Sequence, residues 1–484
     1  MKKIHIISMA LVASLAITSC EKTLQTEPKN SISAEVALKE AAGVEGLVNS
    51  CYESLQSVNY YGRNFFVVPE VLSDNMRIVN SNSNRFVNES NNTIGSTIDL
   101  WALGYSTINR ANGAIKYADI ANGLTPLRKK QLTGEALFIR ALVYFDLVKS
   151  YGYNPKQIVS GRNLGVPIVL TFVENYPTDI VYPSRNTVDE VYTQIKKDLD
   201  VAITLLDNTA APKRANLAAA YALRARVALF NGDWQDAATF ATSALGAGVG
   251  TFVDAGAAAT PTQKSDAYKT IWTSASSPES LFELNFEVTE SLGSDGLSSI
   301  YTRSNPITTA GAGYGDASPQ ANLVADYATG DVRKDLLVQL VKGSETILWN
   351  QKYPAAKGPQ IDNIKLLRVS ELYLTRAEAN FRNGTTIGAT PQADLDKIRL
   401  RAGLISTPVT LDAILKERRV ELAYEGQRWF DLLRTGSAVN KSTTTLPANS
   451  TPNSTIAATD FRLLARIPLT EVQNNPKITQ NFGY

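Results

Sequence analysis

The residues best suited to carry chemistry lie in one charged stretch, residues 417–436, which reads ERRVELAYEGQRWFDLLRTG. Its ionisable side chains Glu425, Arg428, Asp431 and Arg434 recur three residues apart, the spacing of partners on one helix face. Two carboxylates beside a cleft would supply the acid and the base of a glycosidase. Because helical ion pairs are far commoner than catalytic dyads, the stretch predicts a packed polar network rather than an active site.

The residues around this stretch predict one long helix to position it. Thr410 is a favoured N-cap residue, and Gly436 is a favoured residue just past a helix end. Val420, Ala423 and Phe430 recur at helical spacing and mark a face that points inward.

Other catalytic classes lack their side chains. The only histidine, His5, lies near the N-terminus in a segment that we expect to be removed, which excludes Ser-His-Asp, Cys-His and HExxH sites from the mature chain. The glycine-rich run at residues 311–315 has no Walker spacing. No carboxylate cluster has metal-ligand spacing. We therefore expect a protein that is not an enzyme and that has no cofactor and no metal site.

The N-terminus predicts a secreted, lipid-anchored protein. Lys2 and Lys3 precede a mostly apolar run, Ile4–Ile17, that is too short to span a bilayer well, and Cys20 follows where a cleavage site is expected. This pattern resembles a bacterial lipoprotein signal, in which Cys20 carries the lipid. An ordinary secretory signal that ends near a cysteine is the alternative. Cys51 would then be the remaining cysteine, and its apolar helical surroundings predict a buried, inert thiol.

Composition indicates a soluble globular chain of neutral charge. The 484 residues are 44% hydrophobic and 19% charged, with 48 basic and 46 acidic residues. Removal of Lys2 and Lys3 leaves the two signs equal. A neutral chain without a basic stripe has no field that would attract nucleic acid, so we expect no nucleic-acid partner.

Periodicity along the chain predicts a mostly α fold with long irregular loops and a few short strands. The segment 217–246 is a helix-turn-helix whose alanine spacing resembles the second half of a tetratricopeptide repeat. Short strands are expected at 281–286 and 347–351, and loops are expected at 60–92 and over much of 247–359. The expected helical segments are 34–57, 98–121, 125–152, 187–206, 217–246, 366–404 and 411–433.

Binding is better supported than catalysis. Sugars are held by stacking on aromatic rings and by hydrogen bonds from Asn, Asp and Arg. The aromatics of the helical segments are expected to pack in the core, so ligand residues should come from the stretches 60–77 and 272–349. The candidate ligand-binding residues are Tyr60, Tyr61, Asp74, Asn75, Arg77, Trp272, Tyr301, Arg303, Tyr314 and Trp349.

An ordered set of motifs resembles the SusD/RagB-type outer-membrane lipoproteins of Bacteroidetes. The charged stretch matches the ER-x-x-ELA-x-EG-x-R-x-FDL-x-R-x-G hallmark of that family from Glu417 to Gly436. The other matching segments, in chain order, are Trp101–Asn112, Gly134–Gly152, Arg185–Ile195, Ala222–Ala237, Gly330–Arg333, Leu367–Ala379, Arg399–Leu404 and Ile467–Tyr484.

The resemblance implies a tetratricopeptide-like helical scaffold, a cell-surface position held by a lipid anchor alone, and a SusC-type TonB-dependent transporter as partner. It implies an oligosaccharide ligand, although some members take peptides. A surface glycoside hydrolase stays open as the alternative from another class. The expected organisation is a signal peptide at 1–19, a lipidated tether at 20–33 and one SusD-like domain at 34–484. Within that domain we expect a helical scaffold at 98–246 and 365–436 and a loop-rich ligand face at 247–359.

Overall fold

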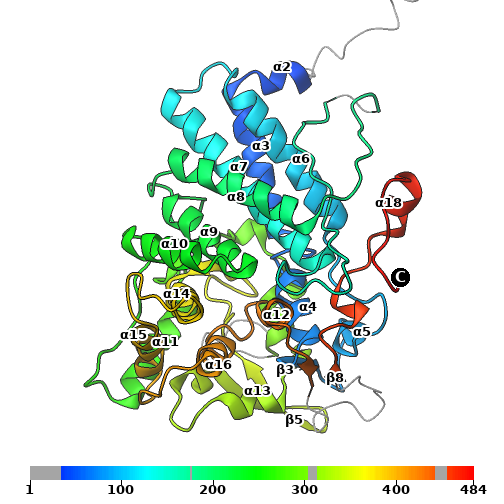
Figure 1. The fold of residues 1–484 in the computed structure, drawn as a ribbon. Coiled ribbons are helices and arrows are strands. Elements are labelled where there is room, and N and C mark those ends of the chain that lie inside the picture. Colours follow the sequence, from blue (N-terminus) through cyan, green and yellow to red (C-terminus); the bar gives the residue numbers. More distant parts are fainter. Residues whose placement is uncertain (1–33, 175–176, 304–312, 442–454) are drawn as a thin grey trace, which may run out of the picture.

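Helices form the framework of the computed structural model, which describes residues 34–174, 177–303, 313–441 and 455–484 (Figure 1). The expected mostly α fold with short strands is confirmed. The leader, Cys20 and the tether 20–33 lie outside the described residues. None of the described helices is both long enough and apolar enough to cross a membrane.

The long helices pack on one another largely in chain order. α6 packs on α7, α7 on α8, α8 on α9 and α9 on α10, and α10 then packs on α14, which also contacts α15 and α16. Figure 1 shows α3, α6 and α7 at one end of this arrangement and α14 to α16 at the other. The bounds are α3 (Ala41–Gln56), α6 (Trp101–Ala118), α7 (Pro126–Tyr151), α8 (Val188–Leu205), α9 (Leu217–Asn231), α10 (Trp234–Gly246), α14 (Val369–Asn383), α15 (Pro391–Arg401) and α16 (Leu411–Glu421).

Local sequence signals set where these helices begin. The Thr125 side chain accepts a hydrogen bond from the Arg128 amide, and Pro126 occupies the first helical position of α7. Thr187 and Glu190 form the capping box of α8, as the sequence predicts. Each cap satisfies backbone amides that the helix itself leaves without a partner.

The core lies around α7 and between the alanine-rich helices. Every residue of α7 from Gly134 to Tyr151 is buried, so this helix contacts other elements on all sides. α9 and α10 place alanines at their contact, and most of these are fully buried. Small side chains let two helix backbones approach closely, which agrees with the repeat-like spacing in the sequence.

The strands form four separate two-stranded antiparallel sheets. β2 pairs with β6, and β4 pairs with β5 as a hairpin. The strands expected near 281–286 and 347–351 are β2 and β5. The paired strands are β1 (Met76–Ile78) with β3 (Ala317–Pro319), β2 (Ser280–Leu284) with β6 (Ile364–Arg368), β4 (Leu337–Lys342) with β5 (Glu345–Asn350), and β7 (Val439–Asn440) with β8 (Thr455–Ile456).

Two stretches that the sequence analysis assigned to loops contain helices. Residues 60–92 hold a nine-residue helix that is buried from its second residue onward, and residues 247–359 hold a thirteen-residue helix that ends at Thr273. The helices of these stretches and the remaining short helices are α2 (Ala34–Leu38), α4 (Asn64–Leu72), α5 (Val87–Ser90), α11 (Pro261–Thr273), α12 (Leu297–Tyr301), α13 (Ala321–Asp326) and α18 (Leu469–Asn474).

The expected single helix from Thr410 to Gly436 is wrong in its middle. Thr410 caps α16 and Gly436 ends α17 (Arg428–Thr435) in a left-handed conformation, as expected. Between the two helices the backbone turns, and Tyr424 and Gly426 both take positive φ values, 72° and 71°. A Cβ on Gly426 would lie 2.6 Å from the Phe65 carbonyl oxygen, so α4 approaches this turn too closely for any other residue.

The residues after position 464 bind the region that follows α7. The Ala465 amide donates to the Ser150 carbonyl, and the Asn481 side chain donates to the Tyr151 carbonyl at 3.0 Å. Arg185 donates to the carbonyls of both Tyr151 and Thr479. These bonds join segments that are about 300 residues apart in the chain.

Candidate ligand-binding site

The charged stretch builds a buried ion network rather than an exposed face. We use this term for Glu279, Arg333, Lys352, Arg368, Arg401, Glu417, Glu421 and Glu425. At its centre Glu421, which is fully buried, lies 2.7 Å from guanidinium nitrogens of both Arg368 and Arg401. The prediction of a packed polar network is confirmed.

The partners within that stretch differ from those that a single helix would give. Asp431 pairs with Arg434 at 2.7 Å, as predicted. Arg428 instead binds Asp74 in α4's following turn at 2.6 Å, and Glu425 binds Arg368 at 2.8 Å. The break between α16 and α17 turns these side chains in different directions, so the sequence spacing no longer decides their partners.

Tyr60 and Tyr61 are buried, and the expectation that they form an exposed stacking platform is wrong. Their rings stack on each other with centroids 4.3 Å apart, and both hydroxyl groups donate to Asp146 of α7. Lys149, one turn further along α7, pairs with the same carboxylate at 2.8 Å and lies over the rings of Phe145 and Phe430. The hydrogen bonds to Asp146, about 85 residues later in the chain, therefore hold both tyrosine side chains in the core.

Trp272, Tyr301 and Trp349 are also fully buried, so the same correction applies to them. Trp272 is the penultimate residue of α11, and Lys352 and Arg368 lie over its ring at 4.6 and 5.5 Å from its centroid. The Tyr301 hydroxyl donates to the Phe66 carbonyl, and the Trp349 indole donates to the Gly315 carbonyl at 3.2 Å. These rings support loops from beneath instead of facing a ligand.

The three polar candidates that follow α4 are buried as well. Asp74 binds Arg428, and Asn75 donates to Glu70 at 2.8 Å. Arg77 in β1 pairs with Glu345 at 3.4 Å. Most of their hydrogen-bonding groups are committed to protein partners, which contradicts the expectation that they present free groups to a ligand, although the Arg77 Nε has no partner among the described residues and Asp74 lines a pocket of about 470 Å³.

Tyr314 and Arg303 are the two candidates that the structure leaves exposed; the Tyr314 side chain is 38% exposed. They lie close together, because the Gly313 amide donates to the Arg303 carbonyl at 3.0 Å. The Tyr314 amide donates to Ser299, and Lys342 donates to the Tyr314 carbonyl at 2.6 Å. The exposed ring is thus held by hydrogen bonds to its own backbone.

Residues that the sequence analysis missed complete this surface. Arg85 lies over the Tyr314 ring, 4.5 Å from its centroid, and Asp295 bridges Arg85 and Arg63 at 2.9 and 3.0 Å. Arg63 in turn lies over Phe86. We call Arg63, Arg85, Phe86, Asp295, Arg303 and Tyr314 the Tyr314 surface. The polar composition of residues 80–92 indicates a binding loop, and that loop contains Arg85 and Phe86. No sequence pattern indicates Asp295.

Two guanidinium groups of the Tyr314 surface, those of Arg63 and Arg85, lie close enough to affect the pKa of Arg63. Burial lowers the pKa of Arg63, and the neighbouring Arg85 lowers it further, whereas Asp295 raises it. The Arg85 side chain is 31% exposed and the Asp295 side chain is 49% exposed, so both can reach a ligand. The surface therefore combines the exposed Tyr314 ring with two guanidinium groups that Asp295 holds in place.

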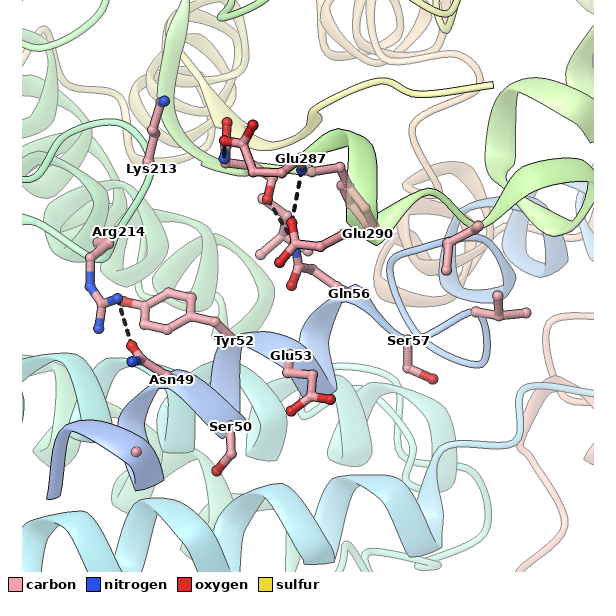
Figure 2. A pocket seen from close by; sticks show the side chains of 16 residues that line it. Asn49, Ser50, Tyr52, Glu53, Gln56, Ser57, Lys213, Arg214, Glu287 and Glu290 are labelled. Carbon is pink, nitrogen blue, oxygen red and sulfur yellow. Dashed lines mark hydrogen bonds between the residues drawn. The ribbon is translucent and has the colours of Figure 1, made fainter. Parts of the chain in front are cut away.

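A separate cleft of about 1070 Å³ lies between α3, the segment before α9 and the segment after β2 (Figure 2). Arg214 closes one side, lying over the Tyr52 ring and donating to Asn49 at 2.9 Å. On the opposite side Gln56 donates to the Asn285 carbonyl at 2.7 Å. The sequence analysis did not single out this cleft, because its walls come from three distant segments.

The cleft carries more carboxylates than free cations. Glu53, Glu287 and Glu290 line it, and Figure 2 shows the Glu53 side chain directed away from the wall that carries Glu287 and Glu290. Lys213 also lines it, and the side chains of Lys213 and Glu53 form no hydrogen bond or ion pair with the described residues. The aromatic rings of Tyr52 and Phe286 are buried beneath it, so it offers no exposed stacking platform.

Burial raises the pKa of four described carboxyl groups, those of Glu70, Glu89, Asp362 and Asp394, and of these Glu89 is partly exposed. Burial raises the pKa of Glu70 to about 7, but its side chain is fully buried and accepts hydrogen bonds from the amides of Tyr424 and Gly426. In the cleft, a hydrogen bond from Asn285 and the charge of Lys357 lower the pKa of Glu287. The described residues include no group of three or more His, Cys, Asp or Glu side chains arranged to hold a metal ion.

Comparison with known families returns two matching family models. One, described as "Starch-binding associating with outer membrane", matches residues 24–229. The other, described as the SusD family, matches residues 337–484. Together they cover α2 to α8, most of α9, α14 to α18 and the buried ion network apart from Glu279 and Arg333, whereas α10 and α11 lie between the two matches.

Curated relatives and solved structures agree with these matches. SusD-like protein P38 of Formosa agariphila is 26% identical over 100% of this chain and 99% of its own length. The starch-binding protein SusD of Bacteroides thetaiotaomicron is 30% identical over a shorter region, 32% of this chain and 28% of that protein. A putative sugar binding protein from Bacteroides vulgatus has a TM-score of 0.77 at 27% identity, covering 94% of this chain and 100% of that one.

Proposed function

The chain belongs to the SusD/RagB family, and from that premise we propose that it binds oligosaccharides without cleaving them and delivers them to a SusC-type TonB-dependent transporter. The proposed binding site is the Tyr314 surface. The proposed location is the outer membrane at the cell surface, held by a lipid on Cys20. Relatives named for starch or sugar binding support the ligand class.

The observation that carries the site is the exposure of Tyr314 beside a fixed set of donors. Tyr314 is 38% exposed, so the ring face that Arg85 does not cover is available for a sugar ring, and Arg85, Asp295 and the exposed Arg303, whose backbone lies close to Gly313, can bind hydroxyl groups. The other candidate aromatics are buried. The cleft has the larger volume but no exposed ring, so it is the weaker candidate for a sugar.

The non-catalytic part of the proposal rests on the carboxyl groups. Glycosidases need one carboxyl of raised pKa and one ionised carboxylate at the ligand. Glu70 has a raised pKa but is enclosed by α4 and the turn at 422–427, and Glu89, whose pKa burial also raises, is not among the residues of the Tyr314 surface or the cleft. Incubation of the protein with a polysaccharide panel should release no shorter sugars, and release of product would instead favour a surface glycoside hydrolase.

Titration calorimetry against an oligosaccharide panel tests the site. Tyr314→Ala should lower the affinity by about 5- to 30-fold, since loss of a stacked ring costs on the order of 1–2 kcal/mol. Tyr182→Ala is the matched control, because Tyr182 is 50% exposed on a different segment and its loss should leave affinity unchanged. Unchanged affinity in Tyr314→Ala together with lost binding in Glu53→Ala would move the site to the cleft.

The transporter is tested separately by co-purification. A SusC-type barrel encoded beside this protein should be retained by the wild-type protein and equally by Tyr314→Ala, because the ring contributes to ligand binding rather than to docking. If the barrel never co-purifies while oligosaccharide binding is intact, the delivery step is wrong and the binding function stands.

A further inference from the structure

We propose that the oligosaccharide held at the Tyr314 surface is anionic, carrying carboxylate or sulfate groups that bind Arg85 and Arg303. The proposal rests on the proposed function and names the substrate class of that same site. It follows from an excess of positive charge that this surface does not neutralise internally.

The charges at the surface are out of balance by two. Asp295 is the one carboxylate shared by Arg63 and Arg85. Arg303 is exposed and forms no ion pair among the described residues. The residues of the Tyr314 surface therefore include three guanidinium groups and one carboxylate, and two of the three guanidinium groups pair with that carboxylate.

Two carboxylates next to the surface, those of Glu345 and Asp316, are already committed to other groups, and burial raises the pKa of a third, Glu89. Glu345 pairs with Arg77 and also accepts from the Asn80 amide at 2.9 Å. Asp316 pairs with Lys342 at 3.2 Å and accepts a hydrogen bond from the Ser83 hydroxyl. Each of these two carboxylates is matched by one cation, so neither reduces the excess at Arg85 and Arg303.

The guanidinium donors fit an anion better than a hydroxyl group. Arg303 is exposed, whereas the Nη2 atom of Arg85 lies 2.9 Å from Asp295 and its Nη1 atom is buried without a hydrogen-bond partner among the described residues, so an anion at Arg85 must move the atoms that cover Nη1. A guanidinium group presents a planar fork that matches two oxygens of a carboxylate or a sulfate. A neutral hydroxyl would accept one such bond and leave the charge uncompensated.

The position of Tyr314 explains why the anion would belong to a sugar. A free small anion would use the guanidinium groups alone, whereas the exposed ring beside Arg85 adds an apolar face of the kind on which a pyranose stacks. One uronate or sulfated residue could place its ring on Tyr314 and its charged group against Arg303. The cleft shows the opposite balance, because Glu53, Glu287 and Glu290 would repel an anion.

The test compares three probes of equal length by calorimetry at about 50 and 300 mM NaCl. The probes are an oligogalacturonate, a sulfated galactan oligosaccharide and a malto-oligosaccharide. We expect at least one of the two anionic probes to bind tenfold or more tightly than the neutral probe at low salt. That advantage should fall at high salt because screening weakens exposed charge pairs, and the better anionic probe tells carboxylate from sulfate recognition.

Matched variants assign the effect to this surface. Arg303→Gln and Arg85→Gln should each remove most of the preference for the anionic probe, whereas Lys213→Gln, which removes an exposed cation from the cleft, should not change it. Arg303 is exposed and has no ion pair within the described part of the chain, so its variant should keep the wild-type melting temperature and remain interpretable.

The failure outcomes separate the two proposals. Equal or tighter binding of the neutral probe, with loss in Tyr314→Ala, would overturn the anionic class and leave the binding function intact. An anionic preference that survives Arg303→Gln and Arg85→Gln but is lost in Lys213→Gln would also overturn it. No binding of any probe, or binding that Tyr314→Ala leaves unchanged, would count against the proposed site itself.

Discussion

Replacement of Glu421 by Gln tests whether the buried ion network is structural. Glu421 has no solvent exposure, and its carboxylate lies 2.7 Å from nitrogens of Arg368 and Arg401 and 3.1 Å from Arg333. Gln keeps the size of the side chain and removes the charge, so three guanidinium groups lose their shared counter-ion.

The expected cost can be worked from these contacts. Removal of one partner from a buried ion pair costs about 3–5 kcal/mol, because the remaining charge stays buried. A chain of 484 residues should unfold with an entropy of roughly 1 kcal/mol/K, from about 2 cal/mol/K per residue. The melting temperature should therefore fall by about 3–5 °C.

The pH dependence of the effect has a definite sign. Burial alone would raise the pKa of Glu421, but Arg401, Arg368 and Arg333 hold it well below its usual value of 4.5. A carboxyl group whose pKa is depressed by folding stabilises the folded state above the pKa of the unfolded chain and loses that contribution as pH falls. The gap in melting temperature between wild type and Glu421→Gln should be widest above about pH 5 and should narrow in acid.

Differential scanning calorimetry from pH 3 to pH 8 measures both effects, with Glu45→Gln as the control. Glu45 pairs with Arg128 at 3.0 Å, but its side chain is 42% exposed, so its loss should cost no more than about 1 kcal/mol. Equal shifts in the two variants, or a Glu421→Gln gap that is independent of pH, would refute the reasoning.

Three further outcomes are expected. Gly426→Ala should lower the melting temperature more than Gly384→Ala. Both residues have positive φ, and alanine in that conformation costs roughly 1–2 kcal/mol of stability. Of the two, only Gly426 also has a backbone oxygen 2.6 Å from the new Cβ. In a Cys20→Ala protein, Cys51 should resist an aromatic disulfide reagent until the chain is unfolded, since burial raises the pKa of its thiol to about 12; rapid labelling of the native protein would contradict this. Cys20→Ala should also shift the protein from the outer-membrane fraction to the soluble fraction, because anchoring depends on the acyl chains, and retention in the absence of the transporter would show that the lipoprotein prediction is wrong.

Features that depend on neighbouring residues in the chain could be predicted from the sequence. Thr125, Thr187 and Thr410 cap helices where the pattern places them, because an N-cap needs only its own first turn. The Thr260-Pro261 pair has the same N-cap pattern and begins α11, although the composition of the surrounding residues favours a loop. The buried, inert environment predicted for Cys51 is likewise confirmed.

Features that depend on distant partners could not be predicted. The break between α16 and α17 places the amides of Tyr424 and Gly426 on Glu70, more than 350 residues earlier in the chain. Tyr60 and Tyr61 look like loop aromatics until Asp146 supplies a buried acceptor. At the Tyr314 surface, the exposed positions of Tyr314 and Arg303 agree with the sequence analysis, whereas the pairing of Arg63 and Arg85 through Asp295 depends on the folded chain.

The bonds between the end of α7 and residues 465–481 have a consequence for the order of folding. Asn481 lies 330 residues after Tyr151, and Thr479 lies 294 residues after Arg185, so these bonds cannot form until nearly the whole chain is present. Contacts of such sequence separation are expected to form late, because the entropy of closing the intervening loop opposes them. Until then the junction between the end of α7 and the segment after it stays open to other chains. The helix pair α9 and α10 has no such delay, because its contacts are completed within about thirty residues.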